Sequence, residues 1–292
     1  MRAELRRPPP VGVRSAVVLS LLAAGVVSFF RLGLTWEQLV PGRDAFRQMG
    51  AFLAAAFTPA LVNEAGAPPG TPPLLRQALD AAALTVVFAT TALSVALVLG
   101  VGLGFLASSV WWSGERATAR SPAARLFARV VAPAMLAAAR TLIAVMRSIH
   151  ELVWAILLLC ALGLNDLAAV VAIAIPFGGT LAKVFSEMLD EAPRDSADAL
   201  RGAGASRTQV FLFGLLPRAL PDMAAYTLYR YECALRSSAI LGFFGWRTLG
   251  YFIKQQWDVA DYPEVWTYLY TLLALVLLVE WWSGQIRRRF VA

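Results

Sequence analysis

Long apolar blocks separated by shorter polar segments run through most of the chain. A membrane-spanning helix needs about 20 consecutive, mostly apolar residues. Six stretches come close to this requirement, at about 15–34, 81–110, 141–162, 167–185, 221–243 and 265–282. The pattern predicts an all-α integral membrane protein with about six transmembrane helices.

The region before the second block is less regular. Its first apolar run follows a basic start, as in a signal peptide, but no obvious small-x-small cleavage site comes after it. We expect a retained first helix, with a cleaved signal as the alternative. In the loop that follows, DAFRQMGAFLAAAFTPALV has apolar residues at helical spacing, which is typical of an interfacial amphipathic helix. We therefore divide the chain into residues 1–80 and a core transmembrane domain, residues 81–292.

Composition favours a membrane protein over a soluble one. Hydrophobic residues make up 59% of the chain and charged residues 15%, against about 45–50% and about 25% in soluble domains. The net charge of +7 could indicate a nucleic-acid partner. However, the arginines flank apolar blocks instead of forming one basic face, which is a topology signal of membrane proteins. We therefore expect the lipid bilayer, and no nucleic acid, as a partner.

Neither a metal site nor a nucleotide site is indicated. The two cysteines, Cys160 and Cys233, lie inside apolar segments and belong to no spaced Cys/His cluster, so neither a disulfide framework nor a zinc site is expected. The chain has no G-x-x-x-x-G-K-[ST] phosphate loop, and the nearest stretch, GGTLAK, lacks the glycine before Lys183. We expect no cofactor and no ATP bound to this chain.

The arginines also predict an orientation. With the N-terminus inside, the inner segments hold sixteen arginines and the outer segments hold six basic residues. Because positive residues favour the cytoplasmic side, we expect a multi-pass protein of the bacterial plasma (inner) membrane with both termini in the cytoplasm. The tryptophan pairs at 111–112 and 281–282 then fall at cytoplasmic interfaces, where amphipathic rings settle. The amphipathic helix lies in a periplasmic loop.

A polar insert, DALRGAGASRTQVFLFGLLP (Asp198–Pro217), separates the fourth and fifth blocks. With the residues just before it, the segment 193–217 reads as two short helices joined by a tight turn. Gly204 suits a left-handed helix exit, and Ser206 with Gln209 matches a capping box that starts the second helix. The segment is either a helical loop that only joins two spans or a docking element for another protein, and spacing alone leaves both open.

Three prolines are expected to set the limits of these helices. Pro193 suits the first turn of the first short helix, where its missing N–H would have no helical partner in any case. Pro217 is expected to stop the second short helix, and Pro221 to begin the fifth membrane helix. The segment would then be a compact helix pair on the cytoplasmic face.

The insert resembles the coupling motif of ABC importer permeases, commonly written EAA---G---------I-LP. The matching residues are Asp198, Ala199, Gly204, Leu216 and Pro217. Aspartate replaces the usual glutamate, Leu200 replaces the second alanine, and Gly214 stands at the usual isoleucine.

A second resemblance is to the permeases of phosphonate ABC importers. It rests on YTLYRYECALRSSAILGFFG (residues 226–245), on GASRTQVFLFGLLPRALP and on MRSIHELVWAILLL. It covers roughly residue 74 to the C-terminus and is strongest over residues 146–250. Two positions differ from the usual pattern. GWRTLG stands where glycines such as GAGGIG are common, and His150 stands where proline is usual.

These resemblances imply a type I (MetI-like) ABC importer permease with cytoplasmic coupling helices at about 193–217. Such a subunit is not catalytic, and it would carry phosphonate or a related oxyanion such as phosphite or phosphate. Its partners would be a cytoplasmic ABC ATPase dimer, a periplasmic substrate-binding protein and a second copy of the permease or a paralogue. Gly204 would let the two coupling helices approach closely. The ATPase-coupling residues would be Asp198, Ala199, Gly204, Ala205, Leu216 and Pro217.

Two clusters of ionisable residues fall inside the expected spans, where charges are costly and usually face protein or a water path. They are Arg147, His150 and Glu151 in the third span, and Arg230, Glu232 and Arg236 in the fifth. One hypothesis is that the arginines line an anion path, because guanidinium binds phosphonate oxygens bidentately. The other is that the clusters form structural ion pairs, for example Arg147 with Glu151, which are four residues apart on one helix face.

Three other functions stay open. A permease for a different small solute would share every feature above, and an ion-coupled secondary transporter would explain the charges but not the polar insert. An intramembrane enzyme would need a nucleophile with a base, or a metal cluster. The sequence has no G-x-S-x-G, no H-E-x-x-H and a single histidine, which disfavours this class.

Overall fold

The structure is a computed structural model that describes residues 12–33, 35, 40, 42–62, 72–112 and 121–291. Over these residues every regular element is a helix, as the sequence predicts. The chain divides into two compact units, residues 1–57 and 58–292. The predicted functional division between residues 80 and 81 stays a prediction, although the helix expected from residue 81 already begins at Leu74.

The first unit contains α1 (Val13–Arg31) and α3 (Arg43–Ala55). None of the residues in the membrane-length part of α1 is buried within the protein. A helix that exposes apolar side chains on all sides suits a lipid environment. α3 falls on the predicted amphipathic segment and is shorter than expected, since it ends at Ala55. Its position at a membrane interface stays a prediction.

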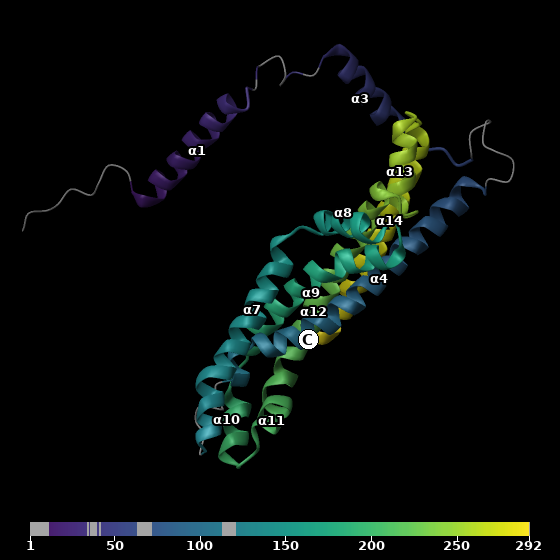
Figure 1. The fold of residues 1–292 in the computed structure, drawn as a ribbon. Coiled ribbons are helices and arrows are strands. Elements are labelled where there is room, and N and C mark those ends of the chain that lie inside the picture. The colour runs from purple at the N-terminus through teal and green to yellow at the C-terminus, as the bar shows by residue number, and fades with distance from the viewer. Residues whose placement is uncertain are drawn as a thin grey trace, which may run out of the picture. The chain divides into compact units, whose positions relative to one another are not determined.

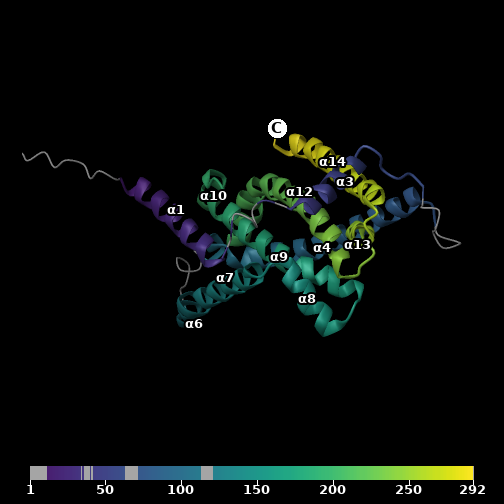
Figure 2. The same cartoon turned by 90° about the horizontal axis from the view of Figure 1, so that it is seen from above.

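The second unit contains the other helices (Figure 1). A π-helical segment, Phe127–Val131, joins α6 to α7, and a second one, Val210–Leu215, joins α11 to α12. In both views α10 lies at one end of this unit, and α8 and α13 lie toward the other (Figures 1 and 2). The helices are α4 (Leu74–Ala107), α6 (Pro122–Leu126), α7 (Ala132–Ser148), α8 (Glu151–Leu162), α9 (Asp166–Glu191), α10 (Asp195–Gly202), α11 (Arg207–Gln209), α12 (Leu216–Ile240), α13 (Leu249–Asp258) and α14 (Tyr262–Val291).

The central helix of this unit is α9. Of its membrane-length residues 61% are buried, against 33% in α4. A methyl group added to Gly100 of α4 would lie 2.6 Å from Cβ of Leu181, and one added to Gly104 would lie 3.1 Å from Cβ of Phe185. The contacts advance along both helices in the same direction, so α4 and α9 are parallel. Small residues bring helix backbones together in this way inside membranes, and we call this contact the α4–α9 seam.

Five helices of the described residues are long and apolar enough to cross a membrane: Arg14–Arg31, Leu74–Ala107, Phe127–Ser148, Asp166–Glu191 and Tyr262–Arg289. The remaining predicted span corresponds to α12. This helix is 25 residues long but carries five charged residues, which keep it outside the apolar set. Part of that charge is covered by protein, since Glu232 is only 8% exposed. Charged residues in membrane helices usually face the protein interior in this manner.

The third predicted span is not one helix. α7 ends at Ser148, Ile149 is extended, and His150 is the N-cap residue of α8. The Nδ1 atom of His150 accepts a hydrogen bond of 3.3 Å from the N–H of Leu152. The membrane-length helix lies earlier in the chain, and the apolar residues after the corner form the separate helix α8. The expectation of a single helix over residues 141–162 is therefore wrong.

The block LGFFG, part of the phosphonate-permease resemblance, forms a tight corner between α12 and α13. Gly245 has a left-handed φ of 115° that favours glycine. A methyl group on Gly242 would overlap the amide nitrogen of Tyr251, and one on Gly250 would overlap the carbonyl oxygen of Ala239. Glycine is thus required here by backbone contact as well as by conformation.

Candidate functional site

The predicted helix pair at residues 193–217, which we call the coupling corner, begins with α10 and turns at Gly204. Gly204 has a φ of 80°, as a left-handed helix exit requires. The Ser206 N–H donates to Oε1 of Gln209 over 2.8 Å, and the Gln209 N–H donates to Oγ of Ser206 over 3.4 Å. The predicted turn and capping box are therefore confirmed.

Gly204 and Gly214 of the coupling corner differ in how closely other atoms approach them. A methyl group on Gly204 would meet no atom within 4 Å, whereas one on Gly214 would lie 3.1 Å from the Cα atom of Ala197 in α10. Gly204 was expected to permit close helix approach, and this is wrong. The close approach occurs at Gly214, the position where the coupling motif usually has isoleucine.

The proline expectations are also wrong. Pro193 precedes α10, which begins at Asp195. Pro217 lies in the first turn of α12, and Pro221 lies inside that helix. A proline near a helix start removes no necessary hydrogen bond, and the π-helical segment before Pro217 connects α11 to α12 without a stop. The second coupling helix and the expected fifth span are therefore one continuous helical stretch.

The predicted coupling residues lie on the surface of this corner or just beneath it. Asp198, Ala199, Gly204 and Pro217 are exposed, and Ala205 and Leu216 are half-buried. Asp198 forms an ion pair of 2.9 Å with Arg201 one helical turn away. Asp198 and Pro217, the first and last residues that match the coupling motif, are thus both accessible to another protein.

The coupling corner is held firmly to the membrane helices. Arg218 of α12 donates to Oγ of Ser196 in α10 over 2.9 Å. The guanidinium of Arg207 lies 4.2 Å from the ring centre of Trp111, and Phe211 packs edge-on against the same ring at 5.3 Å. Cation–π and aromatic contacts of this kind each stabilise by roughly 0.5–1.5 kcal/mol. The rings of Trp111 and Phe211 also pack against Phe105 of α4, at 4.2 and 5.1 Å between ring centres, so these contacts join the coupling corner to α4 and α12.

The two glutamates of the intramembrane clusters make structural contacts. Oγ of Ser237 donates to Glu151 over 2.8 Å and so links α12 to α8. Glu232 accepts hydrogen bonds from Ser283, at 2.6 Å, and from Arg287, at 2.9 Å, both on α14. The expected Arg147–Glu151 pair is wrong, because the corner at residues 148–150 puts these residues on different helices.

Arg147 and Arg230, assigned to different clusters by sequence, both lie against α9. The guanidinium of Arg230 lies 4.0 Å above the ring centre of Phe177 in α9. A methyl group on Gly179 of α9 would lie 3.1 Å from Cγ of Arg147. Arg236 is exposed, and its nearest polar contact is the Cys233 sulfur at 3.9 Å. The role of these side chains and of His150 in a substrate path stays a prediction.

Sequence reasoning missed a set of charged residues between α7 and α9. Asp190 accepts hydrogen bonds from both hydroxyls and two N–H groups of residues 108–110, at 2.7–3.1 Å, and pairs with Arg140 at 3.6 Å. Lys183 forms an ion pair with Glu187. The available signal was spacing, since Arg140 and Arg147, like Lys183 and Asp190, are seven residues apart and share a helix face.

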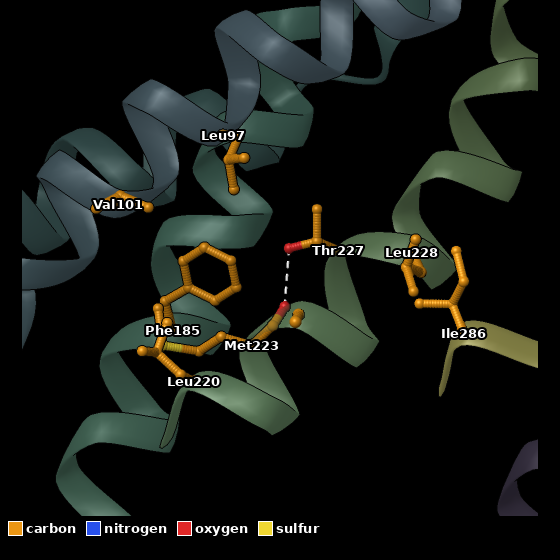
Figure 3. Close-up of a pocket in the computed structure, with 9 residues that line it drawn as sticks. Leu97, Val101, Phe185, Leu220, Met223, Thr227, Leu228 and Ile286 are labelled. Atoms are coloured by element: carbon orange, nitrogen blue, oxygen red, sulfur yellow. Dashed lines mark hydrogen bonds between the residues drawn. The ribbon is translucent and has the colours of Figure 1, made fainter. Parts of the chain in front are cut away.

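A separate cavity of about 400 Å³ lies among α4, α9, α12 and α14. Figure 3 shows that its lining is almost wholly apolar, including Leu97, Phe185 and Met223. The only hydroxyl drawn there, on Thr227, donates to the carbonyl oxygen of Met223 over 2.8 Å (Figure 3). An oxyanion would find no free donor in this lining. Among the described residues no group of three or more His, Cys, Asp or Glu side chains could hold a metal ion.

Comparison with known protein families identifies the chain. The family described as "Binding-protein-dependent transport system inner membrane component" matches residues 120–291, which include the coupling corner and the α7–α9 residues. The chain belongs to this family. With its apolar helices it is a multi-pass inner membrane protein.

Two curated relatives are named as permease proteins, one for phosphite and one for phosphate. The phosphite transport system permease protein PtxC of Stutzerimonas stutzeri is 32% identical over 158 residues, 54% of this chain and 58% of the relative. The phosphate-import permease protein PhnE of Mycolicibacterium smegmatis is 31% identical over 200 residues, 66% of this chain and 38% of the relative. The chain thus spans about half the length of the curated relatives it matches.

Solved structures define the fold. A crystal structure of an amino acid ABC transporter with histidines matches with a TM-score of 0.59 and 16% identity, over 73% of this chain and 94% of that chain. An inward-facing structure of the MetNI methionine ABC transporter matches with a TM-score of 0.56 and 21% identity, over 74% of this chain and 95% of that chain. The predicted type I, MetI-like permease fold is therefore confirmed.

Proposed function

We propose that this chain is the membrane-spanning permease subunit of an ATP-driven importer for phosphonate or a related oxyanion such as phosphite or phosphate. The observation that carries the proposal is the family match over residues 120–291. It contains both the exposed coupling corner and the two arginines, Arg147 and Arg230, that α7 and α12 place against α9. A polypeptide with these two features can receive a mechanical input at one end and guide an anion between its helices.

The oxyanion assignment is supported by names and by charge. Relatives named for phosphite and for phosphate transport match this chain at 30–32% identity. Arginine suits such ligands because its planar guanidinium donates two parallel hydrogen bonds to a phosphonate or phosphate group. Arg147 and Arg230 are the two residues whose position in the structure fits this role best.

The partners follow from the same proposal. A cytoplasmic ABC ATPase dimer binds and hydrolyses ATP and docks on the coupling corner, while this chain binds no cofactor and catalyses no reaction. A second permease copy or a paralogue completes the pore, and a periplasmic binding protein delivers the anion. Both termini and the α10 end of the second unit face the cytoplasm. The tethers from Arg207 to Trp111 and from Arg218 to Ser196 then carry ATPase movement to α4 and α12.

Reconstitution tests this function. Proteoliposomes are prepared with the permease, its ATPase and its binding protein, and uptake of phosphite, phosphate and methylphosphonate is measured with and without ATP. We expect saturable, ATP-dependent uptake of at least one of these anions. ATP-independent uptake, or ATP-dependent uptake of neutral solutes alone, would contradict the proposal.

A substitution at the turn tests the coupling role. Gly204→Val forces a β-branched residue into a left-handed conformation, which costs roughly 1–2 kcal/mol or more. We expect at least about a tenfold loss of uptake, with ATP hydrolysis continuing. Gly202→Val is the matched control, because Gly202 lies two residues earlier and a methyl group there meets no atom within 4 Å. Equal uptake by the two variants would show that the corner is only a connecting loop.

A further inference from the structure

α7 and α9 run antiparallel and turn charged faces toward each other. Arg140 meets Asp190 at 3.6 Å. Seven residues further along α7, Arg147 lies near α9, since a methyl group on Gly179 would be 3.1 Å from its Cγ atom. Seven residues correspond to about two turns, so the two arginines lie on one face of α7. Lys183 precedes Asp190 by the same interval on the facing side of α9.

Between these faces lies a cavity of about 350 Å³. It is partly enclosed and has a mixed polar and apolar lining, unlike the apolar cavity of Figure 3. A water molecule occupies about 30 Å³ of liquid, so the space accommodates a small oxyanion together with several waters. Its polar lining consists of Arg140, Arg147, Lys183, Ser186, Glu187 and Asp190.

The charges around this cavity do not cancel. Arg140 is paired with Asp190, and Lys183 is paired with Glu187. Arg147 takes part in none of the ion pairs that the structure gives for the described residues. One positive charge is therefore in excess on the faces that border the cavity, and its carrier, Arg147, is exposed. A bound anion would supply the missing charge.

We propose that the α7–α9 cavity is an anion-binding site in which the Arg147 guanidinium is the principal ligand and the Lys183 ammonium the second. The identity of the anion rests on the proposed function, and we assign an oxyanion of the phosphonate, phosphite or phosphate class.

Direct binding tests this site without transport. Inorganic phosphite is titrated into the permease–ATPase complex in nanodiscs, without binding protein, and ³¹P line broadening is measured. We expect Arg147→Gln to weaken binding at least about tenfold, and Arg147→Lys to keep most of it, because a charge-assisted hydrogen bond survives in the second variant. Lys183→Gln should weaken binding less than Arg147→Gln. Equal phosphite affinity in the wild type and Arg147→Gln, or no binding to the wild type, overturns the proposal.

Two matched controls separate the site from general charge effects. Arg76→Gln removes an exposed arginine that pairs with Asp80 four residues on. Lys254→Gln removes a lysine that pairs with Asp258 in the same way as Lys183 pairs with Glu187. Both controls should bind phosphite as the wild type does. If Arg147→Gln fails to assemble with the ATPase, Lys183→Gln carries the test, and wild-type phosphite affinity in that variant overturns the proposal.

Uptake distinguishes failure of this site from failure of the proposed function. A wild-type system that imports none of phosphite, phosphate and methylphosphonate contradicts the proposed function. A wild-type system that imports phosphite, with an Arg147→Gln variant of the same KM and maximal rate, contradicts only the cavity site.

Discussion

The two sides of α9 differ in how they meet their neighbours. Toward α4 the helix forms a seam without space, in which Gly100, Gly104 and Gly178 bring the backbones together. Toward α7 it also has a close contact, at Gly179, but the helices then separate around a charged cavity of about 350 Å³. One helix thus combines a closely packed face with a face that borders a charged cavity.

The two faces of α9 show how one core helix can combine close packing with a charged cavity. Close packing of small residues stabilises membrane helices without hydrophobic gain, because lipid tails are as apolar as the side chains they replace. Charged groups need space for water or a counter-ion, and they cannot be accommodated in such a seam. Glycines on one face of α9 meet the first requirement toward α4, and a cavity on a different face meets the second toward α7.

The largest expected effect is at the seam. Gly100→Val places side-chain atoms where even a methyl group lies 2.6 Å from Cβ of Leu181. Overpacking of this kind costs about 1–3 kcal/mol and occasionally more, and we expect the upper end of this range because neither backbone has room to shift. Gly102→Val is the control, since a methyl group there meets no atom within 4 Å. Thermal unfolding followed by tryptophan fluorescence should show a large decrease in Tm for the first variant alone.

A smaller effect is expected at Asp190, which lines the cavity between α7 and α9. Asp190→Asn removes the charge that holds residues 108–110 and Arg140, and hydrogen bonds to a charged group stabilise by about 1.5–3 kcal/mol each. Because an amide keeps part of this bonding, we expect a net loss of about 2 kcal/mol. Glu187→Gln, which breaks an exposed pair with Lys183, should cost no more than about 1 kcal/mol. Equal melting temperatures for the two variants would contradict a special role for Asp190.

The smallest effect compares the same substitution on both sides of α9. Gly179→Ala places a methyl group 2.8 Å from Cβ of Met146 in α7, close to the 2.6 Å of Gly100→Ala at the seam. We expect Gly179→Ala to cost about 1 kcal/mol and less than Gly100→Ala, because the contacts on the α7 side border a cavity and have more room to move. Tm values of the two alanine variants provide the measurement. A larger loss for Gly179→Ala would mean that the α7 face is as rigid as the seam.

Much of the coupling corner could be predicted from local sequence. The capping box of Ser206 and Gln209 and the left-handed Gly204 depend on a few neighbouring residues, and both are confirmed. The prolines misled the prediction, because Pro217 reads as a stop signal and Pro221 as a start signal, whereas the first lies in the first turn of α12 and the second lies inside that helix. The π-helical register of residues 210–215 has no clear sequence signal.

The break between α7 and α8 shows a different limit. Apolar residues stand on both sides of the polar run RSIHE at 147–151, and His150 stands where the phosphonate permease pattern usually has proline. Here the break lies at His150, whose side chain caps the N-terminus of α8. In the sequence alone, a histidine at this position gives no signal that a helix ends. The wrong Arg147–Glu151 pair follows directly from this missed corner.

The sequence by itself determined the membrane class, the helical content, the family resemblance and the local chemistry of the coupling corner, because these depend on composition and on residues close together in the chain. Only the tertiary structure decided which charges meet. Arg147 faces Lys183 across a cavity, Arg230 lies over Phe177, and Glu232 binds Arg287 of α14. These contacts join helices far apart in sequence, and the pairing of charges depends on helix register and on the glycines that set the distance between helices.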